Sequence, residues 1–395
     1  MSNTGFIPYG RQSISDDDIA AVVQALKSDF LTQGPRVTEF EDAIANKVGA
    51  RYAVAANSAT SALHLACLAL GVTAGDRVWT SPNTFIASAN CARYCGADVD
   101  FVDIDPQTYN LCPRQLANKL KQAKRQNTLP KVVIPVHFAG QSCDMQAIHQ
   151  LSKEYGFAII EDASHAIGAG YQGQPVGNGR FSDICVFSFH PVKIITSGEG
   201  GMAVTNHDAL ASHMRTHAQQ GTTKSPEELT QDPGDWYYEQ HTLGFNYRMT
   251  ELQAALGLSQ LSRLDEFIEQ RHAQFMRYQT LLKDFPITLP FQAEDSYSAL
   301  HLFPILLPKS SKDARKSVFD ILRQAGIGTQ VHYIPVHTQP YYQALGFAKG
   351  DYPVAEDYYA RTLSLPLFSE LSEAQQNRVA LLLKHALITS RVMSA

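Results

Sequence analysis

The sequence predicts an α/β fold, with a large domain built on a mostly parallel sheet and a smaller α+β domain after it. The chain has 395 residues, more than the roughly 250 to 300 that one hydrophobic core serves, so two domains are expected. Short apolar strands alternate with helical segments through the first half, which is typical of βαβ units with helices on both faces of a sheet. After Pro286 this alternation ends and prolines separate short apolar segments.

The large domain is expected to span residues 15–250. It begins with a helix capped by Ser15, because this hydroxyl residue precedes three acidic residues and then apolar residues at helical spacing. Strands are expected at Tyr52–Ala55, Arg77–Thr80, Val99–Ile104, Lys131–Val136, Ala158–Glu161, Asp183–Phe189 and Gly201–Thr205. Helices are expected at Ser58–Leu70, Pro113–Arg125 and Met145–Tyr155.

The smaller domain is expected to comprise residues 251–395 together with the N-terminal segment 1–14. One long helical pattern runs from Arg248 towards Leu282 and is expected to connect the two domains. Prolines then interrupt the short strands, because proline cannot donate to a ladder of backbone hydrogen bonds.

Composition excludes several classes of partner. A net charge of -5 offers no positive field for nucleic acid or for an anionic membrane, and neither partner is expected. The chain has no secretory signal pattern and no run of eighteen apolar residues, so a cytoplasmic protein is expected. The six scattered cysteines are expected to be buried, reduced thiols, and no spacing typical of a metal site occurs.

The first candidate for a functional site follows the first predicted strand. Ligands of an open α/β sheet bind outside the carboxyl ends of its strands. Asn57–Ser61 runs directly into a helix, and its hydroxyls, its free backbone N–H groups and the positive end of the helix dipole suit a phosphate. Ser and Thr are also ordinary helix caps, so this segment alone leaves both interpretations open.

A carboxylate and a lysine follow two later strands. Asp162 could bind a metal, orient a base, pair with a protonated ring nitrogen, or only cap the next turn. Lys193 lies in the apolar segment Phe187–Ile195, where burial would favour the neutral amine that reacts with an aldehyde. The two residues are 31 positions apart (193 − 162), about one strand–connection–strand unit, so neighbouring strands could bring them together.

These residues fit the needs of pyridoxal phosphate (PLP), which are a lysine, an acid at its ring nitrogen and a phosphate cradle. Gly198–Gly201 adds a turn in which the backbone can pass close to a ligand. The alternative is a nicotinamide enzyme, because Gly168–Gly173 matches the G-x-G-x-x-G pattern. The residues that follow it, Gln174–Gly179, contain helix breakers and cannot start the helix that a pyrophosphate needs, which disfavours this alternative.

Five motifs occur in order along nearly the whole chain: Asn57–Ala62, Glu161–Ala166, Phe187–Lys193, Gly198–Gly201 and Gly244–Met249. Together they resemble the DegT-type sugar aminotransferase family. Four further segments resemble the branch of that family that acts in pseudaminic acid biosynthesis: Asp29–Gly34, Phe189–Thr196, Gly257–Leu261 and Gln330–Tyr333. The resemblance implies an aspartate-aminotransferase-like fold (PLP fold type I) and a homodimer with shared active sites.

The resemblance also implies which residues bind the cofactor. Lys193 and Asp162 would be catalytic: Lys193 would hold PLP covalently and move protons, while Asp162 would pair with the ring nitrogen. Phe85 would stack on the ring, with a core aromatic on a buried helix as the alternative. His165 stands where many members have Gln, so it either bonds the cofactor's 3-oxygen or packs beside the ring. The implied phosphate ligands are Ser58, Ala59, Thr60, Ser188 and, from the other subunit, Asn246.

The implied substrate contacts are Tyr9, Asp29, Phe30, Leu31, Thr32, Ala59, Ser188, Asn246, Gln330, Val331, His332 and Tyr333. The expected reaction gives an amino group from glutamate to a UDP-linked 4-keto-6-deoxy-hexosamine. Alternatives are another sugar, a sugar dehydratase of the same fold that has a histidine in place of the lysine, and a non-catalytic regulator. Lys193 stands at the lysine position, which disfavours the dehydratase.

Overall fold

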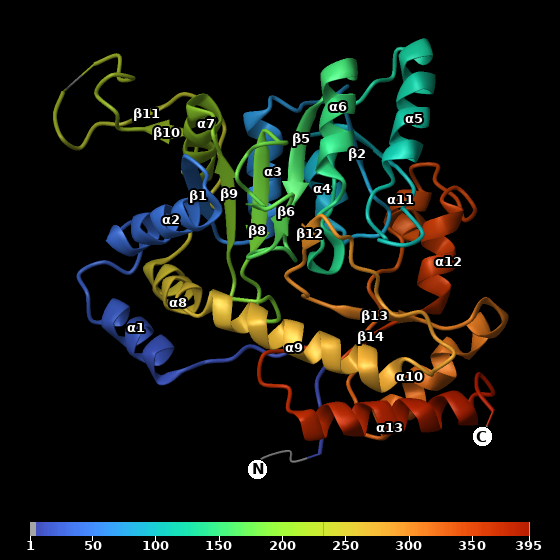
Figure 1. Ribbon diagram of the computed structural model, residues 1–395. Helices are drawn as coiled ribbons and strands as arrows, with labels where there is room; N and C mark the ends of the chain where they lie inside the picture. The colour runs from blue at the N-terminus through green and yellow to red at the C-terminus, as the bar shows by residue number, and fades with distance from the viewer. Residues whose placement is uncertain (1–4, 232, 395) are drawn as a thin grey trace.

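The computed structural model describes residues 5–231 and 233–394 and confirms the predicted α/β fold (Figure 1). A seven-stranded sheet lies at the centre of the large domain, in the order β1-β9-β8-β5-β4-β2-β3. Its strands are β1 (Tyr52–Ala56), β2 (Arg77–Thr80), β3 (Asp98–Phe101), β4 (Val132–Ile134), β5 (Ala158–Asp162), β8 (Ile184–Ser188) and β9 (Gly201–Thr205). Each strand expected from the sequence is present. The bounds of β2 and β9 are as expected, and the ends of the other strands are shifted, most of all at β3.

The sheet is mostly parallel, as predicted. Only β9 runs against its neighbours, pairing antiparallel with β1 and with β8. The remaining pairs, β8 with β5, β5 with β4, β4 with β2 and β2 with β3, are parallel. The carboxyl ends of six strands therefore meet at one edge, together with the start of β9.

Helices cover both faces of this sheet (Figure 1). The large-domain helices are α1 (Asp16–Leu26), α2 (Pro35–Val48), α3 (Ala59–Ala69), α4 (Ala87–Tyr94), α5 (Pro113–Gln126), α6 (Met145–Tyr155), α7 (Asp208–Ala218) and α8 (Glu251–Leu261). Buried side chains of α3, α4 and α7 pack on one face of the sheet. Those of α2, α8, α5 and α6 pack on the other.

The local sequence explains where the helices begin. Ser15 caps α1 as predicted, because its hydroxyl accepts from the Asp18 N–H at 3.3 Å and the Asp18 carboxylate accepts from the Ser15 N–H at 2.9 Å. Ser58 caps α3 in the same way, accepting from the Ser61 N–H at 3.1 Å. Both helices thus begin at a defined residue.

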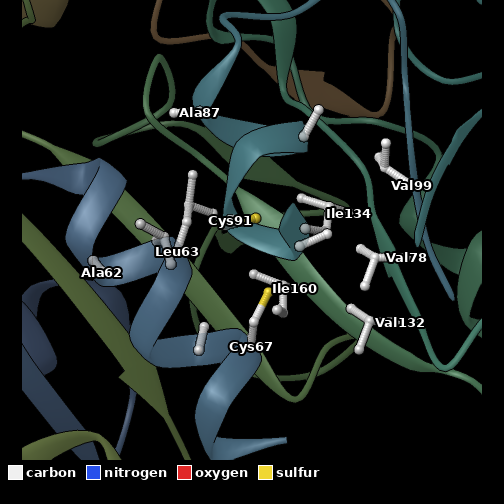
Figure 2. Close-up of a cluster of buried hydrophobic side chains, with 14 of the residues drawn as sticks. Ala62, Leu63, Cys67, Val78, Ala87, Cys91, Val99, Val132, Ile134 and Ile160 are labelled. Atoms are coloured by element: carbon white, nitrogen blue, oxygen red, sulfur yellow. The ribbon is translucent and has the colours of Figure 1, made fainter. Parts of the chain in front are cut away.

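The core between the sheet and α3 is formed by tightly packed apolar side chains. Figure 2 shows Leu63 and Cys67 of α3 and Cys91 of α4 facing Ile134 of β4 and Ile160 of β5. These five side chains are at most 1% exposed, so the helix lies directly against the sheet. All six cysteines are free thiols, and five of them are buried.

A second group of elements forms a smaller layered unit beside the sheet (Figure 1). It contains α9 (Leu264–Leu282), β13 (Phe303–Leu306), α10 (Arg315–Gln324), β14 (Thr362–Leu365) and α13 (Glu373–Thr389). Ile7 joins its core and pairs with Ile327. Two further helices, α11 (Pro340–Gln343) and α12 (Pro353–Arg361), pack their buried side chains on the large-domain core. Because α8 and the start of α9 pack on the large-domain core, we propose a domain boundary within α9 rather than at residue 250.

Short elements complete the described structure. They are β6 (Gly170–Tyr171), β7 (Gln174–Pro175), β10 (Thr222–Thr223), β11 (Glu239–Gln240) and β12 (Ser296–Tyr297), with 3-10 turns η1 (Phe138–Gly140), η2 (Lys309–Ala314) and η3 (Val336–Thr338). None of the helices in the described part of the chain combines the length and apolar character needed to cross a bilayer.

The structure decides two further expectations, one about the helix after Arg248 and one about the Gly168–Gly173 segment. The single helix expected from Arg248 to Leu282 is wrong, because a turn at Ser262 and Arg263 separates α8 from α9. The Arg263 side chain turns back to the buried Asp18 carboxylate, which ties this break to α1. The Gly168–Gly173 segment lies at the β6–β7 hairpin, and no helix begins there, so it is not a dinucleotide-binding turn.

Candidate active site

Asp162 ends β5 at the carboxyl edge of the sheet and is buried. Its Oδ2 accepts from the Ser88 hydroxyl at 2.5 Å, and its Oδ1 accepts from the Ser164 N–H at 3.1 Å. Ser88 Oγ also lies 2.7 Å from the Thr84 hydroxyl. The preceding residue, Glu161, points to the opposite face because side chains alternate along a strand, and it contacts His137 there. The Asp162 carboxylate is therefore held in one orientation beside the sheet edge.

Lys193 lies in the turn that follows β8, the strand next to β5. Its backbone N–H donates to the His190 carbonyl at 2.9 Å, which fixes the turn. Burial lowers the pKa of the Lys193 amine to about 8, and the nearby Asp162 carboxylate opposes this shift. The structure thus brings the predicted lysine and aspartate together from neighbouring strands and leaves the amine largely neutral at slightly alkaline pH.

Three buried histidines surround this pair. Burial, with the charge of Lys193, lowers the pKa of His332 to about 3. Burial and the nearby Lys193 also hold the pKa values of His165 and His301 well below the usual range. The rings of His165 and His301 lie 4.4 Å apart, and His332 Nδ1 lies 2.9 Å from the Ser364 hydroxyl. All three imidazoles are therefore neutral at physiological pH.

The residues predicted to bind the cofactor phosphate lie where α3 meets β9. Ser188 ends β8 and pairs with Gly201 at the start of β9, so it lies beside the N-terminus of α3. Gly201 is required there, because a Cβ on it would lie 2.5 Å from the Ala59 backbone nitrogen. Ser58, Ala59 and Thr60 supply the hydroxyls and the free N–H groups of the first helical turn. Free backbone N–H groups and hydroxyl residues thus gather at the N-terminus of α3, where the helix dipole favours an anion.

Phe85 and Tyr9 lie at the rim of the site. Phe85 is exposed in the loop before α4, with its ring centroid 6.5 Å from that of Tyr333. The alternative role of Phe85, a core aromatic on a buried helix, is therefore wrong. Tyr9 lies 5.4 Å from the His332 ring, and its carbonyl accepts from the Leu367 N–H at 3.0 Å. The N-terminal segment thus lies next to His332, and the contact of Tyr9 with substrate stays a prediction.

The other predicted substrate residues fall into two groups. Gln330, Val331, His332 and Tyr333 belong to one loop, whose Tyr333 N–H donates to the Asn83 side chain at 3.2 Å. Asp29, Phe30, Leu31 and Thr32 form an exposed loop between α1 and α2, whose described contacts run to Thr250 and Glu251 rather than to Lys193. Within one chain, this second group is not brought to the lysine.

Asn246 is exposed, and its carbonyl lies 3.4 Å from the side-chain nitrogen of Asn57 in the same chain. Its backbone therefore lies next to the residue that precedes the cradle. The predicted contact of its side chain with the phosphate of the other subunit stays a prediction.

Sequence reasoning missed Ser88, Asn83 and His301. Ser88 and Asn83 belong to the segment after β2, and the hydroxyl-rich run Thr80–Thr84 at the carboxyl end of a parallel strand was the available signal. His301 comes from the smaller domain and reaches the site because its N–H donates to the Ala139 carbonyl at 2.8 Å. No sequence pattern marks such a contact between domains.

These residues fit PLP. The fixed Asp162 carboxylate suits the ring nitrogen, the Lys193 amine suits the aldehyde, and the N-terminus of α3 suits the phosphate. Within the described residues, no group of three or more His, Cys, Asp and Glu side chains is arranged to hold a metal ion.

Comparison with known proteins gives the same assignment. The model of the DegT/DnrJ/EryC1/StrS aminotransferase family matches residues 12–384. The spore coat polysaccharide biosynthesis protein SpsC of Bacillus subtilis (strain 168) is 40% identical over 372 residues, which cover 93% of this chain and 94% of that protein. The UDP-4-amino-4,6-dideoxy-N-acetyl-beta-L-altrosamine transaminase of Campylobacter jejuni subsp. jejuni serotype O:23/36 (strain 81-176) is 37% identical over 367 residues, 93% of each chain.

Solved structures agree in fold. Helicobacter pylori PseC, an aminotransferase involved in the biosynthesis of pseudoaminic acid, has a TM-score of 0.89 and 31% identity, covering 97% of this chain and 100% of its own. Spr1654 of Streptococcus pneumoniae in its PLP form has a TM-score of 0.88 and 28% identity, covering 98% and 100%. The predicted PLP fold type I is confirmed. The chain therefore belongs to the DegT/DnrJ/EryC1/StrS aminotransferase family and is a sugar aminotransferase that depends on PLP.

Proposed function

We propose that this aminotransferase converts a UDP-linked 4-keto-6-deoxy-hexosamine to the 4-amino sugar nucleotide, with glutamate as the amino donor. The specific substrate proposed is UDP-2-acetamido-2,6-dideoxy-β-L-arabino-hexos-4-ulose, as in pseudaminic acid biosynthesis. The similarity to the C. jejuni transaminase and to H. pylori PseC supports this choice.

The observation that carries the catalytic proposal is the Lys193 amine next to the fixed Asp162 carboxylate. Bound PLP supplies an aldehyde and an electron-withdrawing ring. Asp162 would keep the ring nitrogen protonated, because Ser88 and the Ser164 N–H hold its carboxylate in place. Lys193 would take a proton from one carbon and return it to another, since a pKa of about 8 suits both steps.

A second sugar substrate has its own support. SpsC acts in spore coat polysaccharide biosynthesis, as its name states, and is also similar over most of the chain. A different keto-sugar nucleotide is therefore the second candidate substrate for the same site.

We also propose a homodimer with shared active sites. In one chain, Asp29–Thr32 and the Asn246 side chain are exposed, although the family resemblance assigns both to ligand contacts. A second copy that covers these segments would complete the site.

The visible absorption spectrum of the purified holoenzyme tests the reaction and the substrate together. Glutamate is expected to bleach the cofactor band, and one member of a panel of UDP-linked 4-keto-6-deoxy-hexosamines is expected to restore it. Recovery with a keto-sugar other than the proposed one would support the second candidate. A band that glutamate leaves unchanged would contradict glutamate as the amino donor, and a band that no UDP-linked keto-sugar restores would contradict the proposed substrate class.

Replacing the lysine tests its role. Lys193→Ala is expected to abolish turnover while circular dichroism shows an intact fold, and Lys384→Ala on the exposed side of α13 is the matched control. An active Lys193→Ala enzyme would disprove the assignment.

A further inference from the structure

His165 has both ring nitrogens engaged by other parts of the protein. The Ala139 N–H donates to Nδ1 at 3.2 Å, and Nε2 lies 3.0 Å from the Tyr333 hydroxyl. The two rings are nearly parallel, with centroids 6.0 Å apart and an interplanar angle of 21°. His165 therefore has no ring nitrogen left for a direct hydrogen bond to a ligand.

These contacts fix the tautomer of His165. A nitrogen that accepts from a backbone N–H carries no proton, so the proton of the neutral ring is on Nε2. His165 Nε2–H then donates to the Tyr333 oxygen. The Tyr333 hydroxyl cannot return a proton to His165, and its own hydrogen must point to a different acceptor.

The neutral state of His165 follows from its surroundings. The titratable groups that face the ring are Lys193, His332, His301 and Tyr333, and none of them carries a negative charge at physiological pH. Burial and these neighbours hold the pKa of His165 well below its usual value, so the ring stays neutral at physiological pH.

The strand order shows where on the cofactor this pair would act. The phosphate cradle lies over β1 and β9, Lys193 and Asp162 follow β8 and β5, and Ala139 follows β4. In PLP, the phosphate arm and the phenolic oxygen flank the aldehyde carbon on opposite sides. With the phosphate over β9 and the aldehyde at Lys193, the phenolic oxygen would point towards β4, where His165 and Tyr333 meet.

We propose that Tyr333 donates a hydrogen bond to the phenolic oxygen of bound PLP, and that His165 is a positioning residue that orients the Tyr333 hydroxyl. Within the described residues, the Tyr333 hydroxyl makes no second hydrogen bond to protein, so its hydrogen is available. The loop that contains Tyr333 is itself held in place by two hydrogen bonds. The Tyr333 N–H donates to the Asn83 side-chain oxygen, and the Val336 N–H donates to the Pro82 carbonyl. This inference rests on the cofactor and not on the proposed sugar.

The proposal predicts a spectroscopic effect that needs no substrate. A hydrogen bond to the phenolic oxygen would stabilise its ionised form. It would thereby lower the pKa of the proton that the bound cofactor shares with Lys193. A bond to a charged group contributes enough to move a titration by about one pH unit. Tyr333→Phe is therefore expected to raise the apparent pKa of the bound cofactor by about one unit. A pH titration of the visible band of the holoenzyme measures this change.

Variants at position 165 distinguish a His165 that orients Tyr333 from a His165 that contacts the cofactor directly. His165→Asn keeps an acceptor where Nδ1 lies but does not reach Tyr333, so it should raise the apparent pKa as Tyr333→Phe does. His165→Gln can place an N–H where Nε2 lies and should restore a value near that of the wild type. The double variant His165→Asn/Tyr333→Phe should shift no further than Tyr333→Phe alone.

Tyr297→Phe is the matched control, because this half-exposed tyrosine stacks on His272 at 4.5 Å, outside the site, and should leave the titration unchanged. An unchanged titration in Tyr333→Phe would overturn the proposal. If His165→Asn raised the apparent pKa while Tyr333→Phe left it unchanged, His165 would contact the cofactor directly. Either result would leave the proposed sugar reaction standing, since the titration contains no donor and no sugar.

Discussion

The Asp162 carboxylate depends on a hydroxyl from another element. Ser88→Ala removes the 2.5 Å bond to Oδ2 and leaves the carboxylate free to turn. Because a hydrogen bond to a charged group contributes about 1.5–3 kcal/mol, we expect PLP to bind roughly 10-fold more weakly. Titration of the apo-protein with PLP measures this change.

Ser152→Ala on α6 is the matched control, since its hydroxyl donates only to the His149 carbonyl, away from the site. Equal PLP affinity in Ser88→Ala and in the wild type would show that Asp162 keeps its orientation without this bond.

Lys193 should make cofactor capture dependent on pH. Only the neutral amine attacks an aldehyde, and burial lowers the pKa of Lys193 to about 8 from its ordinary value of 10.5. The rate at which apo-protein acquires the visible band should therefore rise with pH up to about 8 and then level off. Stopped-flow absorbance measures this profile. A rate still rising steeply at pH 10 would mean that the lysine has its ordinary pKa.

We expect the junction of α3 and β9 to bind the cofactor phosphate. Gly201→Ala would place a Cβ 2.5 Å from the Ala59 nitrogen and push the helix start away from β9. Such overpacking costs about 1–3 kcal/mol, so we expect lower stability towards urea and weaker PLP binding together. Gly5→Ala is the control, because a Cβ there would meet nothing within 4 Å. Loss of stability without loss of affinity would contradict a role of this junction in binding phosphate.

The whole molecule carries an exposed apolar surface on α1 and the loop after it, formed by Ile19, Val23, Leu26, Phe30 and Leu31. A monomer seldom leaves such a group uncovered, so we expect these side chains to contact a second copy of the chain. Leu26→Glu combined with Phe30→Glu should shift the dimer towards monomer in analytical ultracentrifugation and reduce turnover. Leu381→Glu, also at an exposed leucine but on α13, should do neither. A monomeric wild-type protein would contradict the proposal.

The sequence was informative where local chemistry decides the structure. Ser15 and Ser58 marked helix starts, because capping involves residues only three positions apart. Apolar strands and their order along the chain indicated the sheet, and the loops after those strands contained Asp162 and Lys193. The break between α8 and α9 was missed, because it depends on a contact of Arg263 with Asp18, which lies 245 positions earlier.

What the sequence determined by itself was the α/β class, the loops that carry the chemistry, and the family motifs, since all of these are patterns among near neighbours in the chain. Only the tertiary structure showed that Ser88 orients Asp162, that His301 enters the site from the smaller domain, and that Ala139 fixes the tautomer of His165. Each of these joins residues far apart in sequence through a specific distance. Periodicity and composition carry no information about distances between residues far apart in the chain, so these contacts are known only from the packed structure.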